Sequence, residues 1–512
     1  MLFFQLISTL LYTAESTNGK DDCVKRFTNP KDKTSMVCVC NTQQCHTFPR
    51  VKSLSGDSAY FYETTASGLR FEKSEIKNNT KNEWDKMGFR LKVITTERFQ
   101  EIIGFGGAMT DAAAINIDRL DNEELEEILL HSYFGDQGIE YNVIRIPIAS
   151  CDFSTREYSY LNTPGDFSLN SFHLAEEDQW KIKFIRRAQK MARLPIKNFG
   201  SPWSAPAWMK TTGHMKGGGK LLEGEKYSKT YAEYFVRFIE DYTAQGIPIW
   251  GVTVQNEPSL GEDEKYGFQA MFFPPKDQSD FVANHLGPTI AKSKVANRTL
   301  IMIHDDFRGN LPEWADITLA NPKTDDFVSG IAVHWYGDRD ADPMKLTQTK
   351  EKHPRKFILG TEACTGPGID LGSFSRGERY AEDIIEDLQH DVSGWVDWNL
   401  ALDLQGGPNW VSNFVDSPII VNHTAKEFYL QPMFYAMGHF SKFIKPGAKR
   451  VSIKMQKVKD VQGIAFINQD GTVAVVVQNK GDFGVKISIE DERGKQYRVT
   501  LQQRSINTLV YK

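Results

Sequence analysis

The sequence predicts an α/β protein built around a (β/α)8 barrel, with antiparallel β-structure contributed from both sides of the barrel region. Helical apolar spacing followed by short buried strands recurs over roughly 300 residues, the pattern expected of this barrel. Outside that region, apolar and polar residues alternate as in half-buried antiparallel strands. A chain of 512 residues has room for several such parts.

The barrel prediction rests on strand candidates that follow helical segments. The helical spacing is clearest for Tyr231, Phe235, Phe238 and Tyr242, and it recurs at Ile182, Ile185, Ala188 and Ala192. A doubly wound open sheet would give similar alternation, but polar residues at the carboxyl ends of many strands favour a barrel. The eight strand candidates are 102–106, 142–148, 196–200, 249–254, 299–304, 330–335, 356–362 and 394–398.

Alternating residues predict a second, antiparallel sheet. Residues 89–93 read Phe-Arg-Leu-Lys-Val, and the tail alternates in the same way at 472–478, 485–490, 497–501 and 507–511, with turns that contain Gly between the segments. We therefore expect residues near 50–99 to pair with the tail after about 448.

The amino-terminal residues resemble a secretory signal peptide, which we place at residues 1–16. The apolar stretch Leu2–Ala14 is too short to span a membrane. The absence of Lys or Arg before it leaves a buried strand as the alternative. Three N-x-S/T sequons, at Asn78, Asn297 and Asn422, agree with passage through a secretory lumen and predict glycosylation.

Four of the six cysteines, Cys23, Cys38, Cys40 and Cys45, fall in one short segment. Such a cluster indicates two disulfides or one zinc site. The secretory leader and the short Cys-x-Cys spacing favour disulfides. Cys151 and Cys364 stand alone.

Composition excludes one class of partner. The net charge is −5 and shows no basic excess, so we expect no nucleic-acid binding. Aromatic residues make up 12% of the chain, and their flat faces suit ligands such as sugars.

Two glutamates end strands on opposite sides of the predicted barrel. The fourth strand runs into Gln255-Asn256-Glu257, and the seventh ends in Thr361-Glu362. Hydrolysis of a glycosidic bond needs such a pair, one acid for the leaving oxygen and one carboxylate for the anomeric carbon. A lone Glu at a strand end is more often a cap or an ion pair. Asn256 favours a site, because its amide can hold a sugar hydroxyl beside the acid.

Other strand ends also carry polar or aromatic residues. Each alone has a structural explanation, but together they predict a sugar site. They are Arg145, Asp152, Trp203, His334, Tyr336, Asp397 and Trp398.

Longer motifs resemble a known family. They are GFGGAMTDAAA (104–114), SCDFS (150–154), SPWSAPAW (201–208), VQNEPS (254–259), GIAVHWY (330–336), TEAC (361–364) and DWNLALDLQGGPNWVSNFVDSPII (397–420). With these motifs, the chain from the cysteine cluster to the tail resembles the lysosomal glucosylceramidases of glycoside hydrolase family 30.

This resemblance implies roles for individual residues. Glu257 would be the acid/base and Glu362 the nucleophile, with Arg145 and His334 supporting the nucleophile side. The residues implied to bind the substrate are Asp152, Trp203, Asn256, Tyr266, Phe268, Tyr336, Trp398 and Asn413. We expect no cofactor and no metal ligand.

The resemblance also implies an architecture and a cysteine pairing. A small disulfide-bearing antiparallel sheet would combine residues 17–49 with 399–432. An immunoglobulin-like β-sandwich would combine residues 50–99 with 448–512, and the barrel would combine residues 100–398 with 433–447. Cys23 would pair with Cys38 and Cys40 with Cys45, leaving Cys151 and Cys364 as free thiols.

We expect a retaining β-glucosidase that acts on glucosylceramide in an acidic lumen. The expected location is the lysosome, with secretion as an alternative. Expected partners are an anionic phospholipid surface and a saposin-type activator. Phe307 replaces the family's Gln, and the loop after Cys364 is short, so the aglycone preference is less defined than the preference for glucose. A secreted β-glucanase and a non-catalytic glycan-binding relative remain as alternatives.

Overall fold

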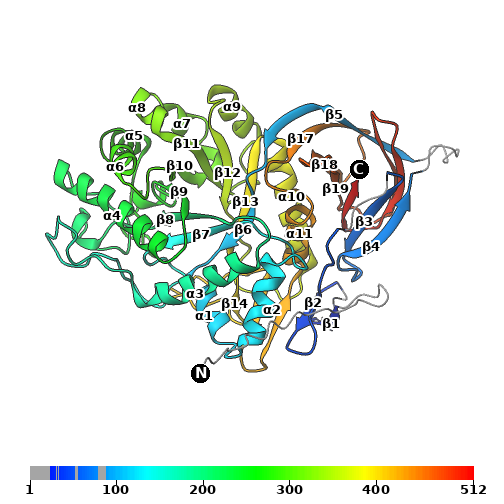
Figure 1. The fold of residues 1–512 in the computed structure, drawn as a ribbon, viewed down its shortest axis with the longest axis horizontal. Helices are drawn as coiled ribbons and strands as arrows, with labels where there is room; N and C mark the ends of the chain where they lie inside the picture. The colour runs from blue at the N-terminus through cyan, green and yellow to red at the C-terminus, as the bar shows by residue number, and fades with distance from the viewer. Residues whose placement is uncertain (1–22, 30–31, 33, 52–55, 79–87) are drawn as a thin grey trace, which may run out of the picture.

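The computed structural model describes the whole chain except residues 1–22, 30–31, 33, 52–55 and 79–87. The signal-peptide prediction therefore lies outside the described residues. The predicted fold class is confirmed: a closed parallel barrel lies beside two largely antiparallel sheets (Figure 1).

The barrel closes in the order β10-β11-β12-β13-β6-β7-β8-β9, so consecutive strands are neighbours. Each strand overlaps one of the eight predicted segments, and the doubly wound alternative is wrong. The strands are β6 (Gly104–Ala108), β7 (Val143–Ile148), β8 (Lys197–Pro202), β9 (Ile249–Thr253), β10 (Leu300–Phe307), β11 (Val328–His334), β12 (Phe357–Glu362) and β13 (Val392–Asn399).

Helices surround the barrel. In α4 the predicted residues Tyr231, Phe235, Phe238 and Tyr242 are all buried, which confirms the helical spacing. The helices are α1 (Asp111–Asp118), α2 (Glu123–Phe134), α3 (Glu176–Met191), α4 (Glu225–Ala244), α5 (Pro275–Phe281), α6 (Gly287–Lys292), α7 (Glu313–Thr318), α8 (Pro322–Phe327), α9 (Met344–Lys352), α10 (Phe374–Gln389) and α11 (Pro432–Ser441), with short 3₁₀ turns η1 (Ala207–Met209), η2 (Leu260–Glu262) and η4 (Arg308–Asn310) and the π-turn η3 (Val282–Leu286).

An apolar layer forms a core cluster of its own within the barrel strands. Six strands each contribute one of its buried side chains: Val143, Phe199, Met302, Ala332, Leu359 and Val396. Side chains two residues further along a strand point to the same face. The next layer therefore begins with Arg145, Ser201, His334, Thr361 and Trp398, and these mostly polar groups define the end of the barrel where chemistry is expected.

Nine strands form the second sheet, in the order β21-β20-β5-β17-β18-β19-β22-β3-β4. Its edge strands β21 and β4 approach each other, and strands from both ends of the chain share one apolar core that includes Phe61, Leu91, Val475 and Leu509. The strands are β3 (Ser58–Thr65), β4 (Glu72–Lys77), β5 (Phe89–Glu101), β17 (Lys449–Met455), β18 (Val461–Ile467), β19 (Val473–Asn479), β20 (Val485–Asp491), β21 (Gln496–Leu501) and β22 (Ser505–Tyr511).

Helices α10 and α11 lie between the barrel and this curved sheet (Figure 1). Helix α10 packs against β13 of the barrel and against β18, β19 and β22. Side-chain amides join the two parts, since Gln389 donates to Gly463 O at 2.9 Å and Gln478 donates to Glu378 O at 2.8 Å.

The five-stranded sheet has the order β1-β2-β16-β15-β14 and joins the two distant segments that the resemblance implied. Its strands are β1 (Val24–Phe27), β2 (Met36–Cys40), β14 (Leu402–Asp403), β15 (Ile419–Asn422) and β16 (Glu427–Leu430). The disulfides Cys23–Cys38 and Cys40–Cys45 are both present, as predicted.

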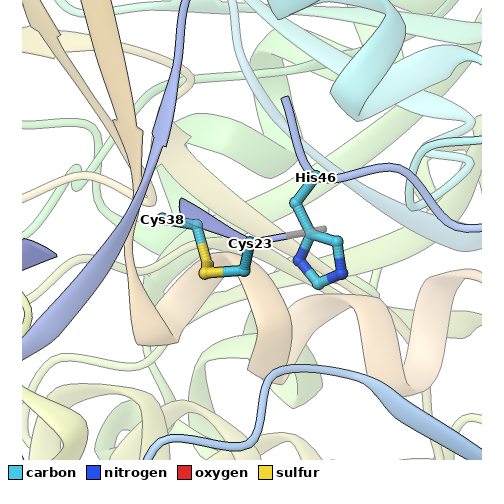
Figure 2. Close-up of side chains that lie close together, drawn as sticks. All are labelled: Cys23, Cys38 and His46. Atoms are coloured by element: carbon cyan, nitrogen blue, oxygen red, sulfur yellow. A yellow bond between two sulfur atoms is a disulfide. The ribbon is translucent and has the colours of Figure 1, made fainter. Parts of the chain in front are cut away.

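His46 lies beside the Cys23–Cys38 disulfide (Figure 2), in a grouping that could otherwise suggest a metal site. Sulfurs joined to each other cannot act as thiolate ligands. The His46 ring is also engaged, because Nδ1 is 2.9 Å from Tyr435 Oη. The zinc alternative for this cysteine cluster is therefore wrong.

The three sequons differ in exposure. Asn297 is exposed, whereas Asn78 and Asn422 are half-buried. Asn422 Nδ2 donates to Tyr429 Oη at 2.9 Å, and Asn78 Oδ1 accepts from Gln496 N at 3.0 Å. Glycosylation remains a prediction at all three. Among the described residues, no helix is long and apolar enough to cross a membrane.

The disulfide arrangement predicts a mass measurement. Alkylation of the denatured, unreduced protein should modify only Cys151 and Cys364, because the other cysteines are in disulfides. After reduction all six should react. Labelling of four or more cysteines without reductant, read by intact mass, would contradict this pairing.

Candidate active site

Glu257 and Glu362 face each other at the carboxyl end of the barrel. Glu362 is the last residue of β12, and Glu257 follows β9 with a φ of +40°. The backbone N–H of Glu257 donates to Asp305 O at 2.9 Å, which fixes this strained turn. One carboxylate oxygen from each glutamate and one His334 nitrogen lie within 4.8 Å of one another. The two predicted carboxylates therefore share one site.

Asp305, in β10, is a fully buried charge that accepts four side-chain hydrogen bonds. Arg145 Nη2 and Thr253 Oγ1 donate to Oδ2 at 2.9 and 2.6 Å. His334 Nε2 and Thr361 Oγ1 donate to Oδ1 at 3.0 and 2.6 Å. Burial alone would raise the pKa of Asp305, but Arg145 and His334 hold it well below its usual range.

His334 is held as an imidazolium. Burial lowers its pKa, but the charges of Glu362 and Asp305 outweigh burial and raise the pKa to about 10. With Nε2 donating to Asp305, Nδ1 donates to Glu257 Oε1 at 3.1 Å. The two hydrogen bonds of His334 therefore go to Asp305 and to the acid/base candidate Glu257, whereas the resemblance implied support for the nucleophile side.

Glu362 receives two donors. Arg145 Nη1 donates to Oε2, and Tyr336 Oη donates to Oε1 at 3.0 Å. The same guanidinium also donates to Asn256 Oδ1 at 2.8 Å. Arg145 thus contacts Glu362, Asn256 and Asp305 together, and the amide nitrogen of Asn256 takes no part in these contacts.

The environment of Glu257 favours its protonated form. Burial raises the pKa of Glu257 to about 7, with a further rise from the charge of Glu362, while the hydrogen bond from His334 opposes it. A carboxyl group that keeps its proton to near neutral pH is suited to general-acid catalysis.

A second group of predicted residues forms one wall of the site. Asp152 Oδ2 accepts from Asn413 Nδ2 at 3.0 Å and from Asn409 Nδ2 at 3.2 Å. Burial raises the pKa of Asp152 to about 7. Trp203 and Trp398 stack with ring centroids 5.1 Å apart, and the Arg145 guanidinium lies over both rings.

Asp152, Asn413, Trp203 and Trp398 line, with the two glutamates, a cavity of about 530 Å³ at the carboxyl end of the barrel. Tyr266 and Phe268 also line it and pack edge to face with ring centroids 4.8 Å apart, and the ring centroids of Phe307 and Tyr336 are 6.3 Å apart. The lining also includes residues that the sequence did not indicate: Leu260, Arg379, Phe414 and Val415. The short loop after Cys364 contributes Gly366 and Pro367.

The structure brings the predicted residues together and places other polar groups among them. The predicted aromatic residues, both glutamates, Asp152 and Asn413 line the cavity. Arg145 and His334 contact the two glutamates, and Asn256 accepts from Arg145. Asp305, Thr253, Thr361 and Ser201 were not predicted. The signal for Asp305 was present, since the fifth strand ends in two aspartates.

Metal ligation at this site is disfavoured by the state of His334. The Glu257, His334 and Glu362 atoms are close enough to surround an ion. However, metal binding requires a neutral imidazole, and both His334 nitrogens donate to carboxylates. A third group that could hold an ion, outside the cavity, is formed by Asp338, Asp383 and Asp387.

A glutamate whose pKa is raised to about 7, opposite a second glutamate held by Arg145 and Tyr336 at the carboxyl end of a barrel, is the arrangement expected of a glycoside hydrolase. The family description "Glycosyl hydrolase family 30 TIM-barrel domain" matches residues 102–444, and the corresponding "beta sandwich domain" matches residues 447–509. The chain belongs to glycoside hydrolase family 30, which confirms the resemblance.

Individual proteins show the same relationship. The lysosomal acid glucosylceramidase of Mus musculus is 42% identical over 500 residues, covering 95% of each chain. Two solved structures are each 25% identical: SrfJ from Salmonella typhimurium, with a TM-score of 0.82, and the endo-β1,6-glucanase BT3312, with a TM-score of 0.78. Each match covers 89% of this chain and 99% of the other protein's chain.

The buried charge of Asp305 predicts a graded pair of variants. Asp305→Asn should destabilise the fold by about 3–5 kcal/mol and abolish activity, because it leaves Arg145 and His334 without their shared anion. Thr361→Val removes one neutral donor and should cost about 1 kcal/mol. Urea unfolding measures both, and equal losses for the two variants would contradict the assignment.

Proposed function

We propose that this protein is a retaining β-glucosidase that hydrolyses glucosylceramide to glucose and ceramide. The observation that carries the proposal is the paired arrangement of Glu257 and Glu362, with oxygens within 4.8 Å, in a chain related to a lysosomal acid glucosylceramidase. Glu257, whose pKa is raised, would act as acid/base. Glu362, which accepts from Arg145 and Tyr336, would act as nucleophile.

The close approach of the carboxylates supports retention of configuration. Retaining enzymes hold their carboxyl groups about 5–5.5 Å apart, whereas inverting enzymes leave about 6.5–9.5 Å for a water molecule. Oxygens within 4.8 Å fit the shorter class. Direct attack by a carboxylate then replaces attack by water in the first step.

The reaction would run in two displacements. Glu362 attacks the anomeric carbon while Glu257 gives its proton to the glycosidic oxygen, and ceramide leaves. Glu257, now a carboxylate, takes a proton from water as that water attacks the glucosyl ester, which frees Glu362 and glucose. His334 Nδ1 would steady Glu257 in both forms, and Arg145 would keep Glu362 oriented.

Both polar and apolar residues line the cavity. Asp152, Asn413 and the stacked tryptophans, together with Asn256 beside Arg145, would bind glucose through its hydroxyls and its apolar face. Six further lining residues are apolar or aromatic: Leu260, Tyr266, Phe268, Phe307, Phe414 and Val415. This apolar share of the lining favours a lipid aglycone over a further polar sugar unit.

Two other functions are weighed against the proposal. The nearest alternative is a β-glucan hydrolase with the same carboxylates. One structural relative, BT3312, is named as an endo-β1,6-glucanase. A non-catalytic glycan-binding protein would not need a glutamate whose pKa is raised to about 7 opposite a second glutamate.

The substrate sets the expected surroundings. At about 0.8 kcal/mol per buried CH₂, a ceramide cannot be extracted fully into water, so catalysis belongs at a membrane surface. The partners would be an anionic phospholipid surface and a saposin-type activator, and the location an acidic lumen, lysosomal or reached by secretion. Acidification moves the net charge from −5 toward positive values, which increases attraction to anionic lipid.

The glutamate roles predict opposite labelling results. Glu362→Gln should not be labelled by a slow fluoro-sugar substrate, because the attacking carboxylate is gone. Glu257→Gln should still be labelled when the leaving group is activated and needs no proton. Intact mass measures both, and labelling of Glu362→Gln would exclude it as the nucleophile.

The state of Glu257 predicts the alkaline limb of the pH profile. Its pKa is raised from 4.5 to about 7, so the acid form persists to near neutral pH and is lost above it. For a substrate with a poor leaving group, kcat/KM should fall about tenfold per pH unit beyond that point. Activity that keeps rising above pH 8 would contradict Glu257 as the acid.

A parallel assay separates the lipid substrate from the polysaccharide. Near pH 5, turnover of glucosylceramide in vesicles should exceed turnover of a soluble β-1,6-glucan, and it should increase as anionic phospholipid is added. The Glu362→Gln variant serves as the blank for both substrates. Faster turnover of the glucan, without any gain from anionic lipid, would assign the protein to the rival function.

A further inference from the structure

Lys210 is a buried cation that no step of the proposed reaction uses. It follows η1, on the segment that leads away from β8, and only 2% of its surface is exposed. Within the described part of the chain it forms no ion pair, and its ammonium group donates to backbone carbonyl groups. A buried charge is costly unless its hydrogen bonds are satisfied, so these carbonyl groups must compensate it.

The Lys210 ammonium joins two segments that are far apart in the sequence. Nζ donates to Met215 O at 3.1 Å and to Gly217 O at 2.9 Å, both in the turn formed by residues 211–220. It also donates to Ala270 O at 2.6 Å, in the segment that follows η2. An ammonium group has three N–H donors, so each of them has a carbonyl partner.

The segment that contains Ala270 also forms a wall of the catalytic cavity, because Tyr266 and Phe268 line it. The backbone N–H of Gly217 donates to Phe268 O at 2.8 Å. The turn whose carbonyl groups accept from Lys210 therefore also holds the backbone of Phe268. Through these contacts Lys210 acts on both sides of Phe268, without lining the cavity itself.

The turn packs so closely against residues 261–264 that the two segments must move together. Gly217 has a φ of +76°, and a Cβ there would lie 2.1 Å from Glu264 O. A Cβ on Gly218 would lie 2.0 Å from Gly261 O. A displacement of the turn would therefore displace the segment that carries Tyr266 and Phe268 as well.

The number of donors on Lys210 depends on its protonation. A neutral amine has two N–H groups and a lone pair, and the lone pair repels a carbonyl oxygen. Burial lowers the pKa of Lys210 to about 7, and the charge of Glu157, in the loop after β7, opposes this effect. The other ionisable side chains of the turn, His214, Lys216 and Lys220, are exposed, as are those at 262–265. Lys210 therefore loses its third donor between acidic and mildly alkaline pH.

We propose that Lys210 is a positioning residue for the aglycone: its ammonium group holds the Phe268 wall in place at acidic pH and releases it above neutral pH. This inference rests on the proposed glucosidase function and adds a determinant of aglycone preference that does not touch the substrate. Asp152 and Glu257 also have pKa values raised to about 7. Their proposed roles concern the glucose and the glycosidic oxygen, which all β-glucosides share, so only the effect of Lys210 should depend on the aglycone.

Amide hydrogen exchange of the full-length protein tests these contacts without using activity. At pH 5, Lys210→Met should speed exchange in peptides covering 211–222 and 261–272 by at least about fivefold, because the turn loses its three side-chain contacts. At pH 8, after correction for the intrinsic pH dependence of exchange, the wild-type protein should exchange like Lys210→Met in these peptides. Lys356→Met is the matched control. Lys356 is also buried and donates to Val328 O at 2.9 Å, but it precedes β12, at the opposite end of the barrel from Glu362.

Kinetics tests the consequence for substrate choice. The ratio of kcat/KM for octyl β-glucoside to that for methyl β-glucoside should fall about fivefold from pH 5 to pH 8 in the wild-type enzyme, the effect of losing roughly one hydrogen bond. In Lys210→Met the ratio should be low at both pH values, and in Lys356→Met it should follow the wild type. No turnover of either glucoside by the wild type would refute the proposed function, and hydrogen exchange would then decide on Lys210.

Three results would overturn the role of Lys210. They are wild-type exchange in 211–222 and 261–272 that does not differ between pH 5 and pH 8, a wild-type ratio that does not change with pH, and a pH-dependent ratio that persists in Lys210→Met. The first two need no variant, so the test holds even if Lys210→Met does not fold.

Discussion

The catalytic end of the barrel depends on one buried negative charge, that of Asp305. A carboxylate with no exposed surface is tolerated only if donors replace its water, and here the donors come from four other strands: Arg145 in β7, Thr253 in β9, His334 in β11 and Thr361 in β12. Hydrogen bonds to the Asp305 carboxylate therefore connect five of the barrel strands. Because Arg145 and His334 each have a second carboxylate partner, the same charge fixes where Glu362 and Glu257 lie.

The two glutamates are chemically identical, and their partners make them different. Glu362 is held by a guanidinium and a phenol, both hydrogen-bond donors. Glu257 is buried with a single imidazolium contact, and burial raises its pKa to about 7. A two-step displacement requires one carboxylate that attacks and one carboxyl group that delivers a proton, and the raised pKa of Glu257 suits it to the second role.

The cluster of Asp338, Asp383 and Asp387 shows the opposite electrostatic situation. Asp305 has full compensation from two cations and two hydroxyls, whereas Asp338 and Asp387 share Arg308 with Glu386, and Asp383 accepts from Trp395. Complete pairing holds the pKa of Asp305 below its usual range, whereas burial and neighbouring carboxylates raise the pKa of each of the three aspartates.

The sequence by itself determined the strands and the polar residues at their ends, because period-2 alternation and strand-end motifs are local properties. The disulfide pairs and the expected roles of the site residues came from the resemblance to the family. The sequence did not determine that Asp305 is the centre. The alternation from Met302 would point His304 into the barrel, but both His304 and Asp305 have positive φ values and the β10–β11 register shifts between His304 and Asp306. His304 consequently turns outward against Trp314, and Asp305 takes the inward position. The pKa values of Glu257 and His334 were likewise decided only by the tertiary structure, since burial and the approach of charges from other strands exist only once the barrel has closed.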